Sequence, residues 1–263
     1  MKGITIDLAA AHALQSLTPR TVALIASIPD LDVPISSSDW TLGEAAVHLV
    51  FGARDYSEHA RGAQRCYRIN PADTAGNHDE LASIAQRDRP ALDTELQLGI
   101  DAFLDATEGR TAEDLLPWHV GSLSCASMTG LLLGEQLLHG YDMAQTLDAE
   151  WPIEAEPARL VVEAWLPLLP RLVDSAAVEG IAVSYELIVD GGPSVIARFC
   201  DGVSIDLSED GPVDCRLSGD SISWLLALYG RVGWENLLRT GGVKMTYGDT
   251  ALGAGFKRLL RNP

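Results

Sequence analysis

Residues 125–147 have the sequence CASMTGLLLGEQLLHGYDMAQTL, and this stretch decides the fold of the first half of the chain. Apolar side chains occur on nearly every side of a helix built from it, a pattern typical of a buried helix. Glu135 and His139 are four residues apart in this stretch, so a carboxylate and an imidazole share one helix face. We therefore predict a buried helix with two ionisable side chains on the same side.

An ionised carboxylate in a protein core is costly unless a positive charge neutralises it. The sequence contains no Lys or Arg between Arg110 and Arg159. A metal ion is the simplest remaining partner, and His48, in a second apolar segment, would supply another imidazole. Two simpler interpretations stay open: Glu135 and His139 form a hydrogen-bonded pair, and His48 is a hydrogen-bonded histidine of the core.

The remainder of the first half also has the pattern of helices. Residues 5–28 carry apolar side chains at helical spacing, with a start or kink at Pro19. Thr41 and Glu44 have the spacing of a capping box, which predicts a helix whose apolar part contains His48. A further helix is expected over about 91–108, after a loop at 70–77. Four helices in this length favour a bundle, in which sites form from inward-facing side chains.

The pattern changes after residue 152. We expect a connecting helix over 157–178, limited by Pro167 and Pro170, and then strands of alternating apolar residues with a hairpin turn at Gly191-Gly192. The predicted strands cover 183–190, 194–199, 203–207, 213–217 and 243–247. Asp220 and Asp249 are predicted N-caps of helices that run to about residues 229 and 260.

These elements predict an α plus α+β fold class with three parts. We expect residues 1–150 to form a helical bundle that contains the candidate metal site, residues 151–180 to connect the parts, and residues 181–263 to form a small α+β domain.

Composition argues against several classes of function. The chain has 263 residues and a formal net charge of −18, which disfavours nucleic acid and anionic membrane surfaces as partners. The same charge repels an anionic substrate at long range, so such a substrate would need a local cation. The four cysteines have no C-x-x-C spacing, and with no signal peptide they predict free thiols in the cytoplasm. No apolar run free of charges is long enough for a membrane span.

His48, Glu135 and His139 would give a metal three ligands from two facing helices. Catalytic zinc commonly has three nitrogen or oxygen ligands and an open fourth position, whereas structural zinc sites close with four ligands. Asp142 lies on the same face, one turn after His139, as an orienting residue or a cofactor contact. The other histidines are expected to be solvated, with His119 kept as a spare ligand or substrate contact; they are His12, His59, His78 and His119.

The motifs resemble those of a known family. The pattern Trp40-Thr41-x-x-Glu44-x-x-x-His48-Leu49, followed by Glu135-x-x-x-His139-x-x-Asp142, is similar to that of the mycothiol-dependent maleylpyruvate isomerase family of DinB-like metalloproteins. The resemblance implies a DinB-like four-helix bundle in which His48, Glu135 and His139 hold a divalent metal, usually zinc. It also implies that the C-terminal domain is sterol-carrier-like, with markers at 218–220, 228–231 and 242–249.

The resemblance implies a function as well. The expected enzyme uses the metal to activate the thiol of mycothiol, a small thiol of actinobacteria, for attack on a small electrophile. It would act as an S-transferase or as a cis-trans isomerase, since both share the nucleophilic step. Arg231, after Gly230, is the expected catalytic residue that anchors an anionic substrate. The alternative role of Arg231 is that of a helix-terminal cation that interacts with the helix dipole.

Two functions of other classes stay open. A non-catalytic carrier of a small molecule or lipid would use the C-terminal domain and would have no need of an open metal site. A regulatory protein would use the metal as a structural element or as a thiol sensor. An open coordination position disfavours a purely structural role.

Overall fold

The computed structural model of the protein describes residues 6–63, 89–118, 121–200, 203–206 and 211–263. The chain forms two compact units, Met1–Ile153 and Glu154–Pro263. The first unit is helical and the second contains a mixed sheet. The predicted fold class, a helical bundle followed by an α+β domain, is therefore confirmed.

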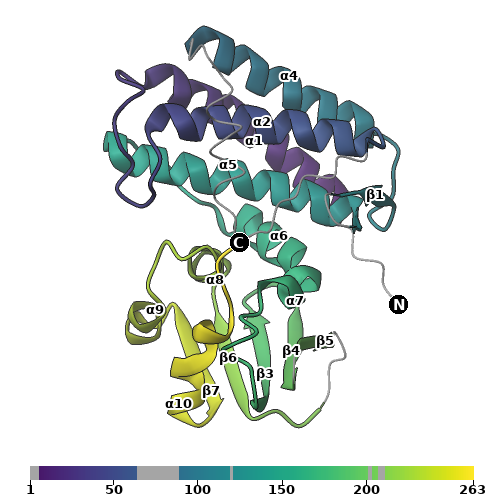
Figure 1. The fold of residues 1–263 in the computed structure, drawn as a ribbon, viewed down its shortest axis with the longest axis vertical. Coiled ribbons are helices and arrows are strands. Elements are labelled where there is room, and N and C mark those ends of the chain that lie inside the picture. Colours follow the sequence, from purple (N-terminus) through teal and green to yellow (C-terminus); the bar gives the residue numbers. More distant parts are fainter. Residues whose placement is uncertain (1–5, 64–88, 119–120, 201–202, 207–210) are drawn as a thin grey trace. The chain divides into compact units, whose positions relative to one another are not determined.

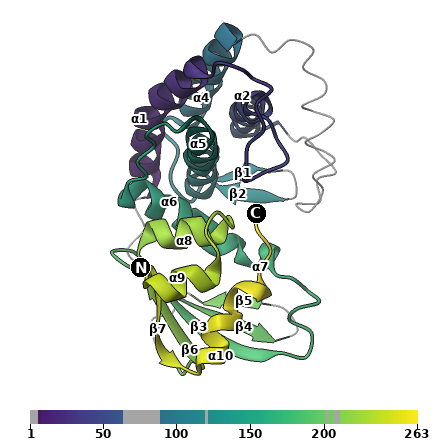
Figure 2. The ribbon, with the colours of Figure 1, turned by 90° about the vertical axis from the view of Figure 1, so that its left-hand side faces the viewer.

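The N-terminal unit is built on long helices that pack side by side (Figures 1 and 2). They are α1 (Ile6–Ser27), α2 (Leu42–Ala60), α4 (Arg89–Thr107) and α5 (Cys125–Leu147). Both α1 and α2 contact α4 and α5, so each helix has two neighbours, as in a bundle. Most of α5 is buried, as its sequence predicts, with Met128, Leu132 and Leu133 among its fully buried side chains.

A buried amide fixes α5 against α1. The Thr21 hydroxyl donates a hydrogen bond to Oε1 of Gln136 at 2.9 Å, and the Gln136 amide donates one to the Thr18 hydroxyl at 3.2 Å. A buried amide without partners would be costly, so these bonds select one register of the two helices. Helix α1 runs through Pro19 without ending there. The register in turn sets the depth at which the neighbouring Glu135 lies.

Helix α2 begins with the predicted capping box. The backbone N–H of Glu44 donates to the Thr41 hydroxyl at 3.2 Å, and the backbone N–H of Thr41 donates to the Glu44 carboxylate at 2.8 Å. These bonds satisfy two of the N–H groups that the start of a helix leaves unpaired. They fix where α2 begins and therefore the helical turn that carries His48.

A small hairpin before α5 was not predicted from the sequence. Strand β1 (Leu115–Pro117) pairs antiparallel with β2 (Ser122–Ser124), and Ser124 then caps α5 by accepting a hydrogen bond from the backbone N–H of Ser127. Strands of three residues are too short for an alternating pattern to be recognised.

Within the described residues, no helix is both long and apolar enough to cross a membrane.

The C-terminal unit contains a mixed sheet with the strand order β5-β4-β3-β6-β7 (Figure 1). Its strands are β3 (Ala182–Val189), β4 (Ser194–Cys200), β5 (Val203–Asp206), β6 (Cys215–Gly219) and β7 (Val243–Gly248). β3 and β6 are parallel, and the other neighbouring pairs are antiparallel. All five predicted strands are present. Gly191 lies in the predicted turn between β3 and β4 with a φ of 72°, which glycine adopts without strain.

The helices of this unit differ from the predicted ones in three places. The helices are α6 (Ala155–Trp165), η1 (Leu166–Leu168), α7 (Leu169–Leu172), α8 (Ser221–Leu228), α9 (Trp234–Thr240), α10 (Thr250–Gly255) and η2 (Phe256–Leu259). Asp220 and Asp249 cap α8 and α10 as predicted. The single helix expected over 157–178 is divided near Pro167, because proline has no N–H to continue the helical hydrogen bonds. Helix α9 was missed, and the last helix gives way to a 3-10 turn.

Candidate metal centre

The three predicted ligand residues lie together between α2 and α5. Nε2 of His48 lies 3.2 Å from Oε2 of Glu135, and Nε2 of His139 lies 3.4 Å from the same oxygen. One ligand atom from each residue lies within 4.8 Å of those of the other two. In the part of the chain that the structure describes, no other group of three His, Cys, Asp or Glu side chains has this arrangement.

The cluster is partly open to solvent. The exposed fractions of the side chains are 22% for His48, 25% for Glu135 and 14% for His139. A structural zinc site is usually closed by four protein ligands. Three partly exposed donors instead leave space for a water molecule or a substrate atom.

Glu135 is the charged member of the cluster. Burial raises the pKa of its carboxyl, but hydrogen bonds from His139 and His48, together with their positive charge, lower it by more, so the pKa lies well below its ordinary range. The carboxyl is therefore ionised at neutral pH. Its ion-pair partners among the described residues are the two histidines, with no Lys or Arg.

The donor set fits a divalent metal. Two imidazole nitrogens and one carboxylate oxygen are ligands that zinc commonly takes at catalytic sites. The i,i+4 spacing on α5 fixes the positions of Glu135 and His139 relative to each other, and the packing of α2 adds His48. Glu135 is an ionised carboxylate and has no Lys or Arg partner among the described residues. A bound cation would therefore neutralise its charge.

Asp142 lies beside this cluster and is buried, with 2% of the residue exposed. Its Oδ1 accepts a hydrogen bond from the Ser37 hydroxyl at 3.1 Å. Ser37 lies in the connection between α1 and α2, so this bond joins the connection to α5. A role of Asp142 as a cofactor contact stays a prediction.

Arg231 belongs to the C-terminal unit, just beyond the end of α8. Gly230 before it has a φ of 71°, and Nη1 of Arg231 donates a hydrogen bond to the carbonyl of Tyr229 at 2.9 Å. This bond holds the guanidinium group near the helix end. The role of Arg231 as a substrate anchor stays a prediction.

One expectation about the other histidines was wrong. His59 is fully buried rather than solvated: its ring packs against Trp118 with 5.2 Å between centroids, and its Nδ1 lies 3.0 Å from the Ala63 carbonyl oxygen. Eleven residues separate it from His48, which is about three helical turns, so both lie on the same side of α2. His12 is exposed, as expected. Cys66, the loop 70–77, His78 and His119 lie outside the described residues.

The sequence predicted no contact for Trp40, although this residue belongs to the motif that precedes His48. The Trp40 ring centroid lies 4.8 Å from that of His48 and 5.4 Å from that of His139. The available signal was its position directly before Thr41, the N-cap of the helix that carries His48.

Comparisons with known proteins relate the chain to one group. Residues 14–144 match the mycothiol maleylpyruvate isomerase N-terminal domain. Crystal structures of the mycothiol-dependent maleylpyruvate isomerase and of a mutant are similar to the chain, each with a TM-score of 0.52. They are 12% and 10% identical to it, and the match covers 92% of this chain and 93% of theirs. At this identity the likeness concerns the fold. No curated protein sequence matches the chain.

Proposed function

Because the chain belongs, through its N-terminal domain, to the mycothiol maleylpyruvate isomerase family, we propose that it is a metal-dependent enzyme that uses a small thiol to attack an electrophile. The thiol is mycothiol, the metal is zinc, and the reaction is S-transfer or cis-trans isomerisation. The family match covers His48, Glu135 and His139. The convergence of these three side chains is the observation that supports the proposal most strongly.

The charges of the three residues favour an anionic fourth ligand. Glu135 contributes one negative charge. Imidazoles must be neutral to bind a metal, so His48 and His139 would contribute none, and one positive charge of a divalent ion would stay uncompensated. A divalent metal in this site would stabilise a thiolate over the corresponding thiol. Because the three side chains are partly exposed, a small thiol can reach the site from solvent.

The chain offers no cysteine of its own for this role among the described residues. Cys125 is fully buried at the start of α5, ten residues and therefore about 15 Å before Glu135 along the helix axis. Cys200 and Cys215 belong to the C-terminal unit and are not members of the metal cluster. Because no cysteine of the described part of the chain is placed to act as the nucleophile, these residues support a co-substrate as the source of the sulfur.

The direct test is turnover that requires both a metal and a thiol. The zinc-loaded protein is incubated with mycothiol and maleylpyruvate, and in parallel with mycothiol and other small electrophiles, and the products are identified by mass spectrometry. We expect isomerised product or a thiol conjugate only when both zinc and mycothiol are present. Turnover without mycothiol, or none with any electrophile in a protein that binds zinc, would contradict the proposal.

Arg231 is proposed to hold the carboxylate of an acidic substrate through its guanidinium group. We expect Arg231→Leu to reduce kcat/KM for an acidic substrate by about ten-fold to a hundred-fold, the loss typical of one charged hydrogen-bonding partner, while the metal content stays unchanged. Arg239→Leu is the matched control, because Arg239 is exposed and bonds to Asn236. Equal turnover in wild type and Arg231→Leu would exclude the anchoring role.

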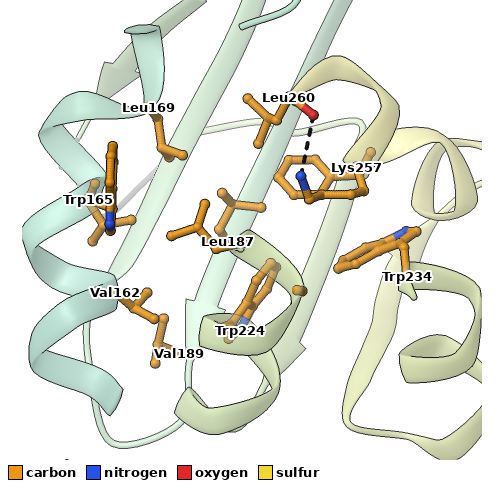
Figure 3. Close-up of a pocket in the computed structure, with 13 residues that line it drawn as sticks. Val162, Trp165, Leu169, Leu187, Val189, Trp224, Trp234, Lys257 and Leu260 are labelled. Atoms are coloured by element: carbon orange, nitrogen blue, oxygen red, sulfur yellow. Dashed lines mark hydrogen bonds between the residues drawn. The ribbon is translucent and has the colours of Figure 1, made fainter. Parts of the chain in front are cut away.

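A second candidate function, a carrier, is favoured by a pocket in the C-terminal unit (Figure 3). The pocket encloses about 490 Å³, including space open to solvent, and its lining is apolar except for Lys257. Figure 3 shows Trp165 and Trp224 on either side of it, with Lys257 at one edge. Apolar pockets with few polar groups commonly bind small molecules.

The carrier and the enzyme differ in their dependence on the metal cluster. A fluorescent fatty acid can be titrated into wild type and into His48→Ala, with the tryptophan fluorescence of the protein as the readout. This signal should respond because Trp165, Trp224 and Trp234 line the pocket. Saturable binding that is equal in both proteins, together with no thiol-dependent turnover in wild type, would support the carrier. Absence of saturable binding would exclude it.

A further inference from the structure

The connection between α1 and α2, residues 28–41, holds Trp40 in a fixed place. The backbone N–H of Ile35 donates to the carbonyl of Trp40 at 2.8 Å, and that of Leu42 donates to the carbonyl of Val33 at 2.9 Å. Pro34 and Thr41 form a β-bridge between these two bonds. The backbone of Trp40 is therefore anchored directly beside the capped start of α2.

The indole of Trp40 packs against both imidazoles of the metal cluster. It is stacked on the His139 ring, with 24° between the ring planes, and tilted by 48° against the His48 ring. The two imidazoles also meet edge to face, with 4.9 Å between centroids. A single side chain thus contacts ligand residues of two different helices.

A second contact fastens the same connection to α5. The hydrogen bond from Ser37 to the buried Asp142 lies one helical turn beyond His139. The connection is therefore joined to the ligand-bearing face of α5 at two points, by Ser37 to Asp142 and by Trp40 to His139. This arrangement limits how far Trp40 can move away from the imidazole rings.

We propose that Trp40 is a positioning residue of the metal centre, which holds the His48 and His139 rings so that both Nε2 atoms face Oε2 of Glu135. This inference rests on the proposed metal site. Rotation of an imidazole about its outer side-chain torsion has a broad energy profile, so packing must fix the ring orientation. The face of an indole also attracts positive charge, which a metal confers on the imidazoles that bind it.

The test compares Co²⁺ binding by wild type, Trp40→Ala and Trp40→Phe. Affinity is measured by competition with a chelator, and the visible absorption of bound Co²⁺ reports the coordination geometry. We expect Trp40→Ala to bind Co²⁺ about ten-fold to a hundred-fold more weakly, as for other residues that orient metal ligands, with an altered spectrum. Trp40→Phe keeps an aromatic face and should retain the wild-type spectrum.

Trp118→Ala is the matched control, because Trp118 packs against His59, a histidine outside the cluster. It should bind Co²⁺ as wild type does. Wild-type affinity and spectrum in Trp40→Ala would overturn the inference and leave the proposed function intact. Failure of wild type itself to bind Co²⁺ or zinc would overturn both. Should Trp40→Ala not fold, Trp40→Leu answers the same question, since leucine fills space without an aromatic face.

Discussion

Replacing Glu135 with alanine is expected to abolish stoichiometric metal binding. Wild type should contain about one equivalent of zinc per chain, and the variant almost none, because three ligands are the usual minimum for a catalytic zinc site. The substitution leaves two neutral imidazoles and removes the only negative charge that the cluster offers. The measurement is elemental mass spectrometry of protein without a purification tag, before and after zinc is offered.

Glu58→Ala is the matched control for this experiment. Glu58 is a carboxylate of α2 whose side chain has the same exposed fraction as Glu135, 25%, and it pairs with Arg54 instead of with the histidines. It should keep the wild-type zinc content. Zinc should also raise the thermal stability of wild type and of Glu58→Ala but not that of Glu135→Ala, because a ligand stabilises only a protein that binds it. Equal zinc content in all three proteins would exclude Glu135 as a ligand. The absence of zinc from all three proteins would favour the carrier function.

Gly140→Ala is expected to destabilise the helical unit strongly. A Cβ atom at position 140 would lie 2.1 Å from Cζ2 of Trp151 and 2.5 Å from its Cε2. The Trp151 indole has little freedom to move, because its N–H donates to the carbonyl of Leu137 at 3.0 Å and the Arg20 guanidinium lies 4.8 Å from its ring centroid. Such overpacking typically costs about 1–3 kcal/mol, and occasionally more.

Gly52→Ala is the matched control, because Gly52 is also inside a helix and its added Cβ would have no atom within 4 Å beyond the neighbouring residues and backbone of its own helix. Alanine is a better helix former than glycine by up to about 1 kcal/mol, so this variant should be slightly more stable than wild type. Urea unfolding, monitored by circular dichroism, gives the change in the free energy of unfolding for each of the two variants. If Gly140→Ala were as stable as Gly52→Ala, the close packing of Trp151 on α5 would be disproved.

The long elements of the fold could be predicted because their patterns extend over many residues. The pattern of residues 125–147 predicts helix α5, which is observed as Cys125–Leu147, and the spacing of Thr41 and Glu44 predicts the capping box that begins α2. Helix α9 and the β1–β2 hairpin were missed, because seven-residue helices and three-residue strands do not complete enough periods to be distinguished from loops.

The candidate site was predictable in its members but not in its surroundings. Glu135 and His139 were linked by their i,i+4 spacing, and His48 by chemistry and by resemblance to a family. The burial of His59 was not predicted, because its polar neighbours suggested a solvated end of the helix. Because α2 continues to Ala60, His59 is part of the helix and lies on its buried side.

The sequence by itself determined the fold class, the long helices of the first unit, the five strands of the sheet, and the shared face of Glu135 and His139. These features depend on the spacing of apolar residues and on caps, and such interactions reach only a few residues along the chain. Tertiary structure alone decided that His48 lies 3.2 Å from Glu135 and that Trp40 packs on both imidazoles. The contacts of His48 with Glu135 and of Trp40 with His139 join residues 87 and 99 positions apart in the chain. They form because the apolar faces of α2 and α5 must be buried against each other.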